Sequence, residues 1–473
     1  MIIKNIPVKF HTVSELTDRT IDVGNAFGLG VDEEKEFEII PDNFEIDIRP
    51  GDIVFITGDS GGGKSLLLSQ LCSALPEYLF GRKISERIPD LGESSLIDTL
   101  GDDTDEAIRY LTFAGLNDAY VMLRRFGELS DGQKYRYLLA KAIAESNRKG
   151  KGKLTLLFDE FLSNLDRETA KAVAYSFQKA VRMNQITLIC ASANNDIYSD
   201  LHPSILVRKH YGYPYKITYR NVPKFPKSSL LEKFTIREGN KKDWLQLEHF
   251  HYRSGMPFGF IKIYVAEYCN EYDETVLAGV RIYSPPPLVL AARNKFLSYV
   301  PRAKEVNRDF VLATRTVVLP KFRGIGLGQK LVKECNILVG KKYVEAIAVM
   351  AKYNPFHRKA GMTIIDSEPD EKLTRVHHDL DMFGLNPKFS SALGYNRNKL
   401  SKMSAEEVEN LRIWLTHSVP NIGFNVSPGV HGTYPKDATY EWYKDTENMC
   451  RVIRKLAVMA EKKVYLVWRN PNI

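Results

Sequence analysis

The stretch "GDSGGGKS", Gly58–Ser65, decides the fold of the first part of the chain. It follows the short apolar run Gly51–Thr57 and leads directly into an apolar helical pattern, "LLLSQLCSAL". A G-x-x-x-x-G-K-[ST] spacing between a strand and a helix is typical of a phosphate-binding loop, because glycines let backbone N–H groups surround a phosphate at a helix N-terminus. We therefore expect a nucleotide to be held by Gly58, Ser60, Gly61, Gly63, Lys64 and Ser65. The Ser65 hydroxyl is also an expected Mg²⁺ ligand.

A second apolar strand pattern lies in "KLTLLFDEFLSNLD", Lys153–Asp166. The continuous run "LTLLF" is typical of a strand that is buried on both faces of a parallel sheet. Ligands bind at the carboxyl ends of such strands, and this strand ends at Asp159 and Glu160. We predict that Asp159 joins the Mg²⁺ shell and that Glu160 is catalytic and polarises the attacking water.

The segment between these two patterns carries a family resemblance. "LSDGQ", Leu129–Gln133, resembles the signature motif of ABC-type ATPases, and "SNLD", Ser163–Asp166, resembles their D-loop. The resemblance covers about residues 1–210 and implies an α/β P-loop ABC ATPase domain with ATP and Mg²⁺ as cofactors. It further implies a homodimer that sandwiches two ATP molecules, in which the nucleotide of one copy is capped by the partner copy's equivalents of Ser130, Gly132 and Gln133.

The chain also departs from that family. Asn194 or Asn195 stands where the family usually has a histidine that contacts the γ-phosphate, and no clear Q-loop glutamine lies between Lys64 and Leu129. The first departure indicates slow hydrolysis or an ATP signal that locks the dimer. The second, together with the lack of an apolar run of about 18 residues, argues against a transporter subunit.

A second glycine loop occurs in "KFRGIGLGQKL", Lys321–Leu331. It lies between a β-branched strand pattern, "DFVLATRTVVLP", and an amphipathic helical pattern. In that context Arg323-x-x-Gly326-x-Gly328 resembles motif A of the GNAT acyltransferases. The resemblance implies that Arg323, Gly324, Gly326 and Gly328 hold the pyrophosphate of acetyl-CoA or another acyl-CoA, and that Val317 and Leu319 lie beside its thioester.

The candidate catalytic residues of this second part come from the same resemblance. His357 stands where the family has a general-acid tyrosine, and imidazole can protonate a leaving thiolate; Tyr353 is a competing candidate. His251 and Tyr252 would line the acceptor site. With Arg315 and "YNP", they also give a weak resemblance to Mom-type acyltransferases, which modify adenine in DNA. Simple packing in a helix or loop is the alternative for each of them.

Between the two loops the composition becomes basic and aromatic. From Leu201 to Lys242 ten Lys and Arg residues accompany only two Glu residues, with four interleaved tyrosines. Such a stretch can bind nucleic acid through phosphate contacts and base stacking. A solvated edge strand followed by a linker explains the same composition, and both interpretations stay open.

The whole sequence limits the remaining possibilities. Its 473 residues are enough for two or three domains, and 44% hydrophobic with 26% charged residues is typical of an ordinary globular protein. A net charge of +8 is compatible with an anionic partner. No signal-peptide pattern occurs, and five scattered cysteines favour reduced thiols, so we expect a cytoplasmic protein without a membrane span.

We therefore predict an α/β protein with three parts. Residues 1–215 would form the ABC-type ATPase domain, 216–384 a mixed α+β GNAT domain with a basic linker at 216–230, and 385–473 a C-terminal accessory module. The predicted function is ATP-dependent dimerisation coupled to N-acyl transfer onto a nucleic acid, a DNA base first and RNA second. An ATP-driven nucleic-acid clamp with a sensor GNAT domain, and a protein or small-amine acetyltransferase, are the alternatives.

Overall fold

The computed structural model divides into two compact units. The first consists of Met1–Ser284 with Ala313–Gly340, and the second of Pro285–Leu312 with Lys341–Ile473. The structure describes residues 2–4, 8–31, 35–40, 44–75, 77–80, 92–211, 215–224, 226–251, 257, 259–348, 351, 354–365, 371–421, 440–459 and 464–473. The predicted boundaries near residues 215 and 384 stay predictions.

The first unit contains a six-stranded sheet with the order β10-β9-β5-β8-β7-β6. Its strands are β5 (Ile53–Thr57), β6 (Tyr78–Phe80), β7 (Thr155–Phe158), β8 (Thr187–Ala191), β9 (Ile205–Arg208) and β10 (Lys216–Tyr219). All neighbouring pairs are parallel except β9 and β10. Since β5 and β8 are buried along their whole length, their continuous apolar runs are those of strands covered on both faces.

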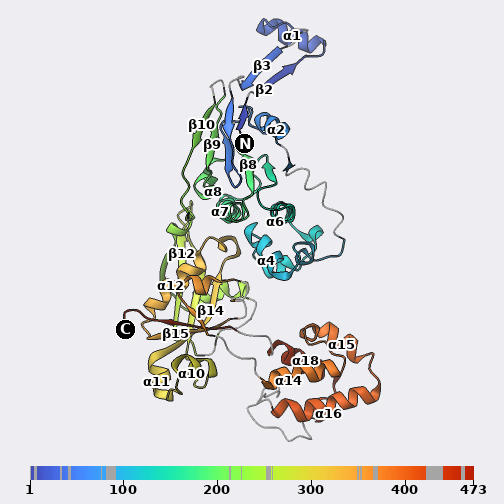
Figure 1. Cartoon of the computed structure of the whole chain (residues 1–473), viewed down its shortest axis with the longest axis vertical. Helices are drawn as coiled ribbons and strands as arrows, with labels where there is room; N and C mark the ends of the chain where they lie inside the picture. The colour runs from blue at the N-terminus through green and yellow to red at the C-terminus, as the bar shows by residue number, and fades with distance from the viewer. Residues whose placement is uncertain are drawn as a thin grey trace. The chain divides into compact units, whose positions relative to one another are not determined.

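Helices cover both faces of this sheet (Figure 1). On one face Val54 and Ile56 of β5 pack with α2 (Lys64–Ser73). On the other, Ile53 and Phe55 join a larger core with α4 (Thr104–Phe113), α6 (Asp131–Lys149) and α7 (Arg167–Met183). The alternation of side chains along β5 thus divides the core into two layers, and the predicted P-loop α/β fold is confirmed.

Two short antiparallel pairs precede β5. They are β1 (Ile2–Lys4) with β4 (Glu45–Asp47), and β2 (Val8–Thr12) with β3 (Lys35–Ile40). Helix α1 (Asp18–Phe27) lies between β2 and β3 in the chain; the Thr17 hydroxyl caps its start and Gly28, with φ +68°, ends it. These caps satisfy the backbone groups that a helix end leaves without partners.

The rest of the first unit carries strands β11 (Thr235–Glu238), β12 (Lys262–Cys269), β13 (Thr275–Ser284) and β14 (Phe310–Val318, in this unit from Ala313), which are neighbours in that order. Helix α9 (Lys241–Leu247) packs Trp244 on Val280 and Ile282 of β13. Helix α12 (Leu327–Leu338) approaches the opposite side of β13, where a Cβ on Gly279 would lie 2.8 Å from Leu331 Cδ1. The mixed α+β character was expected, and the GNAT assignment stays a prediction.

The second unit combines strands with a helical cluster. Strand β17 (Val464–Arg469) pairs antiparallel with both β15 (Tyr343–Ala348) and β16 (Thr363–Ile365). Helices α10 (Ala291–Leu297) and α11 (Ala303–Asp309) also belong here. Arg293 and Glu345 form a fully buried ion pair at 2.7 Å, and the Tyr465 hydroxyl donates to Glu345 as well. A buried pair is tolerated when its remaining polar groups are satisfied in this way.

Four helices of this unit share one apolar core: α14 (Glu371–Met382), α15 (Leu393–Leu400), α16 (Ala405–Asn421) and α18 (Thr446–Met459) (Figure 1). Val376 and Leu380 of α14 contribute to that core, so the helical cluster begins before residue 385. None of the helices in the described ranges is long and apolar enough to cross a bilayer.

Candidate functional site

The first glycine loop connects β5 to α2 as the sequence predicts. Gly63, with φ +86°, forms the N-cap of α2, and Gly58 has φ +138°. A Cβ on Gly58 would lie 1.8 Å from the carbonyl oxygen of Lys209. Glycine is therefore required at residue 58 for two reasons, because the backbone conformation is unfavourable for other residues and because the loop touches the chain after β9.

The ammonium group of Lys64 lies inside this loop. Lys64 Nζ donates to the carbonyl oxygens of Gly58 at 3.1 Å and Asp59 at 2.7 Å, and the Lys64 side chain is buried. Ser65 is exposed in the first turn of α2, and no atom lies within 4 Å of a Cβ built on Gly61. The loop therefore presents backbone N–H groups, an ammonium group and a hydroxyl at one helix N-terminus, which is the donor set that phosphates require.

Asp59 fastens this loop to the segment that follows β9. Its carboxylate accepts from the Tyr211 backbone N–H at 3.2 Å and lies 3.3 Å from His210 Nδ1. Both contacts lower the pKa of Asp59 below its usual value, with the backbone hydrogen bond as the larger cause. Asp59 is consequently ionised at neutral pH and holds the loop from its outer side.

The predicted acidic residues lie at the same edge of the sheet. Asp159 and Glu160 follow β7 directly, and β7, β8 and β5 are parallel neighbours, so their carboxyl ends share that edge. Asp159 is half-buried, while Glu160 is exposed and accepts from the Ser163 hydroxyl at 2.9 Å. The oxygen atoms of Ser65 and Asp159 are of the kind that Mg²⁺ prefers, so this donor set fits the expected metal. Three or more clustered His, Cys, Asp or Glu side chains that could hold a metal do not occur in the described ranges.

The signature motif and the D-loop contact each other directly. Ser130 is the N-cap of α6, and its backbone N–H donates to Gln133 Oε1 at 3.1 Å. Farther along α6, the Tyr135 hydroxyl accepts from the Leu162 N–H at 3.1 Å, and burial raises the pKa of Tyr135. A Cβ on Gly132 would meet Leu165 at 3.2 Å. The helix that starts at the signature motif is thus bonded to the loop that follows β7.

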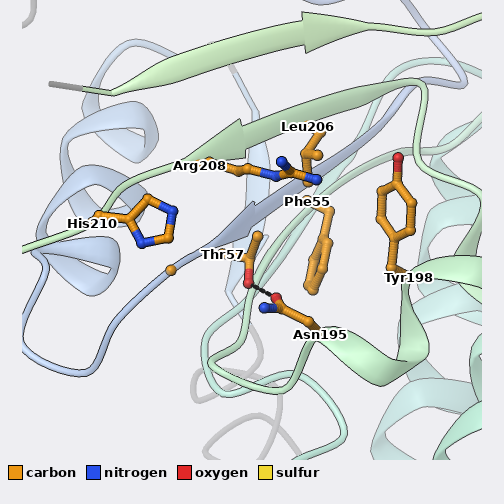
Figure 2. A pocket seen from close by; sticks show the side chains of 8 residues that line it. Phe55, Thr57, Asn195, Tyr198, Leu206, Arg208 and His210 are labelled. Atoms are coloured by element: carbon orange, nitrogen blue, oxygen red, sulfur yellow. Dashed lines mark hydrogen bonds between the residues drawn. The ribbon is translucent and has the colours of Figure 1, made fainter. Parts of the chain in front are cut away.

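The asparagines at the usual histidine position behave differently from each other. The Asn194 backbone N–H donates to the Ser192 hydroxyl at 3.2 Å, whereas the Asn195 side chain accepts from the Thr57 hydroxyl (Figure 2). Asn195 therefore ties the end of β8 to the end of β5, next to Gly58.

A cavity of about 270 Å³ adjoins this contact and was not foreseen from the sequence (Figure 2). Its walls come from the ends of β5 and β9 and from the short helices η3 (Asn195–Ile197) and α8 (Tyr198–Leu201). The lining residues are Phe55, Thr57, Gly58, Asn195, Tyr198, Leu206, Arg208 and His210. Gly58 is the only residue of Gly58–Ser65 among them, so the cavity lies beside the phosphate loop and not along the N-terminus of α2. Arg208 and His210 at the end of β9 were the sequence signal that could have indicated it.

The second glycine loop forms the predicted helix N-terminus but directs its arginine inward. Gly326, with φ +106°, is the N-cap of α12, and Gly328 lies in the first turn. Gly324 has φ +89°. The Arg323 guanidinium donates to the carbonyl oxygens of Asn117 at 2.6 Å, Val318 at 2.9 Å and Phe250 at 3.3 Å. Arg323 therefore binds backbone carbonyls of its own chain in this structure.

The predicted neighbours of the thioester are core residues here. Val317 is buried in the cluster around Trp244, and Leu319 packs against the same cluster. The Leu319 N–H donates to the Ala278 carbonyl at 2.9 Å, which fixes the end of β14 to β13. Their role beside a cofactor stays a prediction.

The predicted catalytic residues of the second part are divided between the units. His251 lies in the first unit, half-buried, with its N–H bonded to the Glu248 carbonyl at 2.9 Å. His357 lies in the second unit, buried on the four-residue helix α13 (Phe356–Lys359). Tyr252 and Tyr353 lie outside the described residues.

Part of the chain is similar in sequence to known ATP-binding proteins. An uncharacterized ABC transporter ATP-binding protein of Methanocaldococcus jannaschii is 21% identical over 222 residues, which is 39% of this chain and 74% of that protein. The lipoprotein-releasing system ATP-binding protein LolD of Novosphingobium aromaticivorans is 28% identical over 200 residues, 35% of this chain and 86% of that protein. A solved dimeric ATP-binding cassette with bound ADP and Pi is 14% identical, covers 47% of this chain and all of that chain, and has a TM-score of 0.31. No protein-family model matches the chain.

The sequence relatives and the loop geometry lead to the same assignment. The first part of this chain is similar to ABC-type ATP-binding proteins, which supports an ABC-type ATPase domain there. The transport systems in the relatives' names belong to those proteins, and the dimeric state of the solved cassette is a property of that protein.

Proposed function

We propose that this protein is a dimerising ABC ATPase whose nucleotide cycle serves an N-acyl transfer. Two copies would enclose two ATP molecules, with Gly58–Ser65 of one copy facing Ser130, Gly132 and Gln133 of the other. Ser65 and Asp159 would hold Mg²⁺, which neutralises phosphate charge when bound. Glu160 would orient the attacking water. The observation that carries this part is Lys64 seated within a loop that starts a helix and in which Gly61 faces open space.

The acyl-transfer part of the proposal rests on the second loop. Gly326 at positive φ starts α12, which follows β14 and the short helix η6 (Pro320–Phe322), and N–H groups at such a helix start would suit a pyrophosphate. Acetyl-CoA, or another acyl-CoA, would lie along Gly324, Gly326 and Gly328. His357, Tyr353, His251 and Tyr252 are the residues proposed for proton transfer and acceptor binding.

Nucleic acid is the proposed acceptor, a DNA base before RNA. The net charge of +8 supports it, as do Tyr211 and Tyr219, which are 72% and 56% exposed. Two tyrosines of the same stretch have structural partners: the Tyr219 hydroxyl accepts from the Asp47 backbone N–H at 2.9 Å, and Tyr215 packs on Phe44 with ring centroids 5.0 Å apart. Exposed aromatic rings among basic residues suit stacking and phosphate contacts.

Mass spectrometry of nucleosides tests the acceptor. DNA and RNA from cells that express the full chain should contain an acylated base that is lost with Lys64→Ala or Arg323→Glu. Lys141→Ala, which removes only a partly exposed lysine 3.9 Å from Glu145, is the matched control and should preserve the modification. Transfer to a free amine that is indifferent to DNA and RNA would contradict the nucleic-acid proposal and favour a protein or small-amine acetyltransferase.

A second function is favoured by one observation. Because Arg323 donates to three backbone carbonyls, the second loop could serve as the sensor part of an ATP-driven nucleic-acid clamp without any acyl transfer. Isothermal titration with acetyl-CoA separates the two functions. Saturable binding that Arg323→Glu weakens supports the transferase, whereas the absence of binding by a folded protein supports the clamp.

A further inference from the structure

The segment Lys321–Gly324, which we name the docking segment, lies against the ATPase elements of the first unit. Lys321 Nζ donates to Glu168 of α7 at 2.6 Å, and the Tyr268 hydroxyl donates to the other oxygen of the same carboxylate at 2.5 Å. Burial, followed by the hydrogen bond to Glu168, raises the pKa of Tyr268, so its hydroxyl keeps the proton that it donates. Glu168 thus holds both Lys321 of the docking segment and Tyr268 of β12.

The backbone of the docking segment makes two further contacts with the ATPase elements. The Gly324 carbonyl accepts from Lys179 Nζ at 3.0 Å, and a Cβ on Gly324 would meet Ser176 Oγ at 2.7 Å. Both partners lie on α7. Asn117 also holds the docking segment. Its backbone carbonyl accepts from the Arg323 guanidinium at 2.6 Å, and its Nδ2 donates to the Arg323 carbonyl at 3.4 Å. The glycine at residue 324 is therefore explained by close approach to α7.

The two elements that contact the docking segment, α7 and the loop that contains Asn117, are both connected to the nucleotide motifs. Helix α7 begins at Arg167, immediately after the D-loop, where the Asp166 carboxylate accepts from the Thr169 N–H at 3.0 Å. The loop that contains Asn117 is bonded to the signature helix, because Arg136 donates to the carbonyls of Gly115 at 3.0 Å and Gly132 at 3.2 Å. One short segment is thus bonded to the two ATPase elements that would face the nucleotide.

From this arrangement we infer that the docking segment is the coupling contact through which ATP occupancy changes the N-terminus of α12. The inference rests on the proposed ATP-binding cycle. It adds the contact through which that cycle affects the second glycine loop. When the D-loop and the signature helix move relative to each other, bonds from one rigid segment cannot all keep their lengths, so the segment must shift or release. Gly326, two residues beyond it, starts α12, and the N-terminus of that helix shifts with it. By linkage, an anion bound at α12 changes ATP affinity by the same factor.

Hydrogen–deuterium exchange on the full chain carrying Glu160→Gln tests the coupling. With Mg·ATP added and bound nucleotide measured in the same sample, amides of residues 319–330 should change their exchange rate by about fivefold or more. Identical exchange with and without bound ATP would overturn the coupling while leaving ATP binding intact. Failure to bind ATP at all would overturn the proposed function, and the coupling with it.

Two variants that break the contact without touching the phosphate loop sharpen the test. Glu168→Gln and Lys179→Met should leave ATP binding unchanged and reduce the ATP-dependent exchange difference by at least about half. Lys262→Met, which removes an exposed pair with Glu238 elsewhere in the first unit, is the matched control and should keep the full difference. A difference that persists in both contact variants would overturn the assignment of these bonds as the coupling path.

Discussion

The two glycine loops of this chain share a local design and differ in their surroundings. Each follows a strand, uses a glycine at positive φ as the helix N-cap, and carries one basic residue close to that cap. In the first loop Lys64 bonds the loop's own carbonyls and Gly61 faces open space. In the second, Arg323 bonds carbonyls of other segments and Gly324 is pressed against α7. The first is therefore arranged for a ligand, and the second is at least partly a contact within the protein.

Glycine can be required in such a loop for two distinct physical reasons. A positive φ requires glycine for conformational freedom, and a close approach requires it for space. Gly61 illustrates the first reason, whereas Gly58 and Gly324 combine both. Sequence patterns cannot separate the two reasons, and substitution to alanine can.

The largest effect is expected for Gly58→Ala. Its Cβ would lie 1.8 Å from a backbone oxygen, which no side-chain rotation can relieve, and φ is +138°. We expect a loss of about 4 kcal/mol or more of unfolding free energy in urea denaturation. Gly61→Ala is the control, because it has a positive φ and open space, and should lose only about 1 kcal/mol. Equal losses would show that close approach is not the cause.

Lys64→Ala is expected to give the next largest effect. Removing the ammonium group from the phosphate site should lower ATP turnover about 100-fold or more, measured as phosphate release, and weaken binding of a fluorescent ATP analogue. Thermal unfolding without nucleotide should change little, since Lys64 bonds only carbonyls of its own loop. Retention of turnover within a factor of about three would contradict the assignment of this loop.

Gly324→Ala provides a smaller and more specific test of the second loop. The variant should lose about 2 kcal/mol of unfolding free energy, from the positive φ and from the contact with Ser176 Oγ at 2.7 Å. In a Ser176→Ala background about 1 kcal/mol should be recovered, because the contacting oxygen is absent. The Ser176 hydroxyl has no hydrogen-bond partner in the described part of the chain, so Ser176→Ala alone should be nearly neutral. Strict additivity of the two substitutions would contradict the docked position of this loop.

The smallest effect is expected for Arg323→Lys. Lysine keeps the charge but cannot reproduce a planar guanidinium that donates to several carbonyls, so about 1–2 kcal/mol of unfolding free energy should be lost. ATP binding should stay unchanged. Lys330→Met on α12 removes one 2.6 Å hydrogen bond to the Phe234 carbonyl and a 4.0 Å ion pair with Glu334, and it is the control for losing one hydrogen bond to a carbonyl. If the control lost more unfolding free energy than Arg323→Lys, the hydrogen bonds of Arg323 would not be the main stabilising contact.

Much of the nucleotide site could be predicted from sequence because its signals are local. The strand-loop-helix pattern around Gly58–Ser65 and the apolar strand ending at Asp159 each depend on neighbours in the chain, and both occur where expected. The contact between Tyr135 and Leu162, and the cavity beside Thr57, join residues that are distant in sequence and left no pattern to read. The different contacts of Asn194 and Asn195 likewise depend on which of the two side chains reaches β5.

The positions of the two helix N-termini that follow glycines can be read from the sequence alone, because backbone freedom and hydrophobic periodicity are short-range properties. What each loop touches depends on the folded chain. Arg323, placed by its pattern on a cofactor phosphate, bonds carbonyls 206 and 73 residues away, and Gly324 lies against a helix of the ATPase part. Such contacts arise from the packing of whole elements, so the residue types at one loop do not encode them alone.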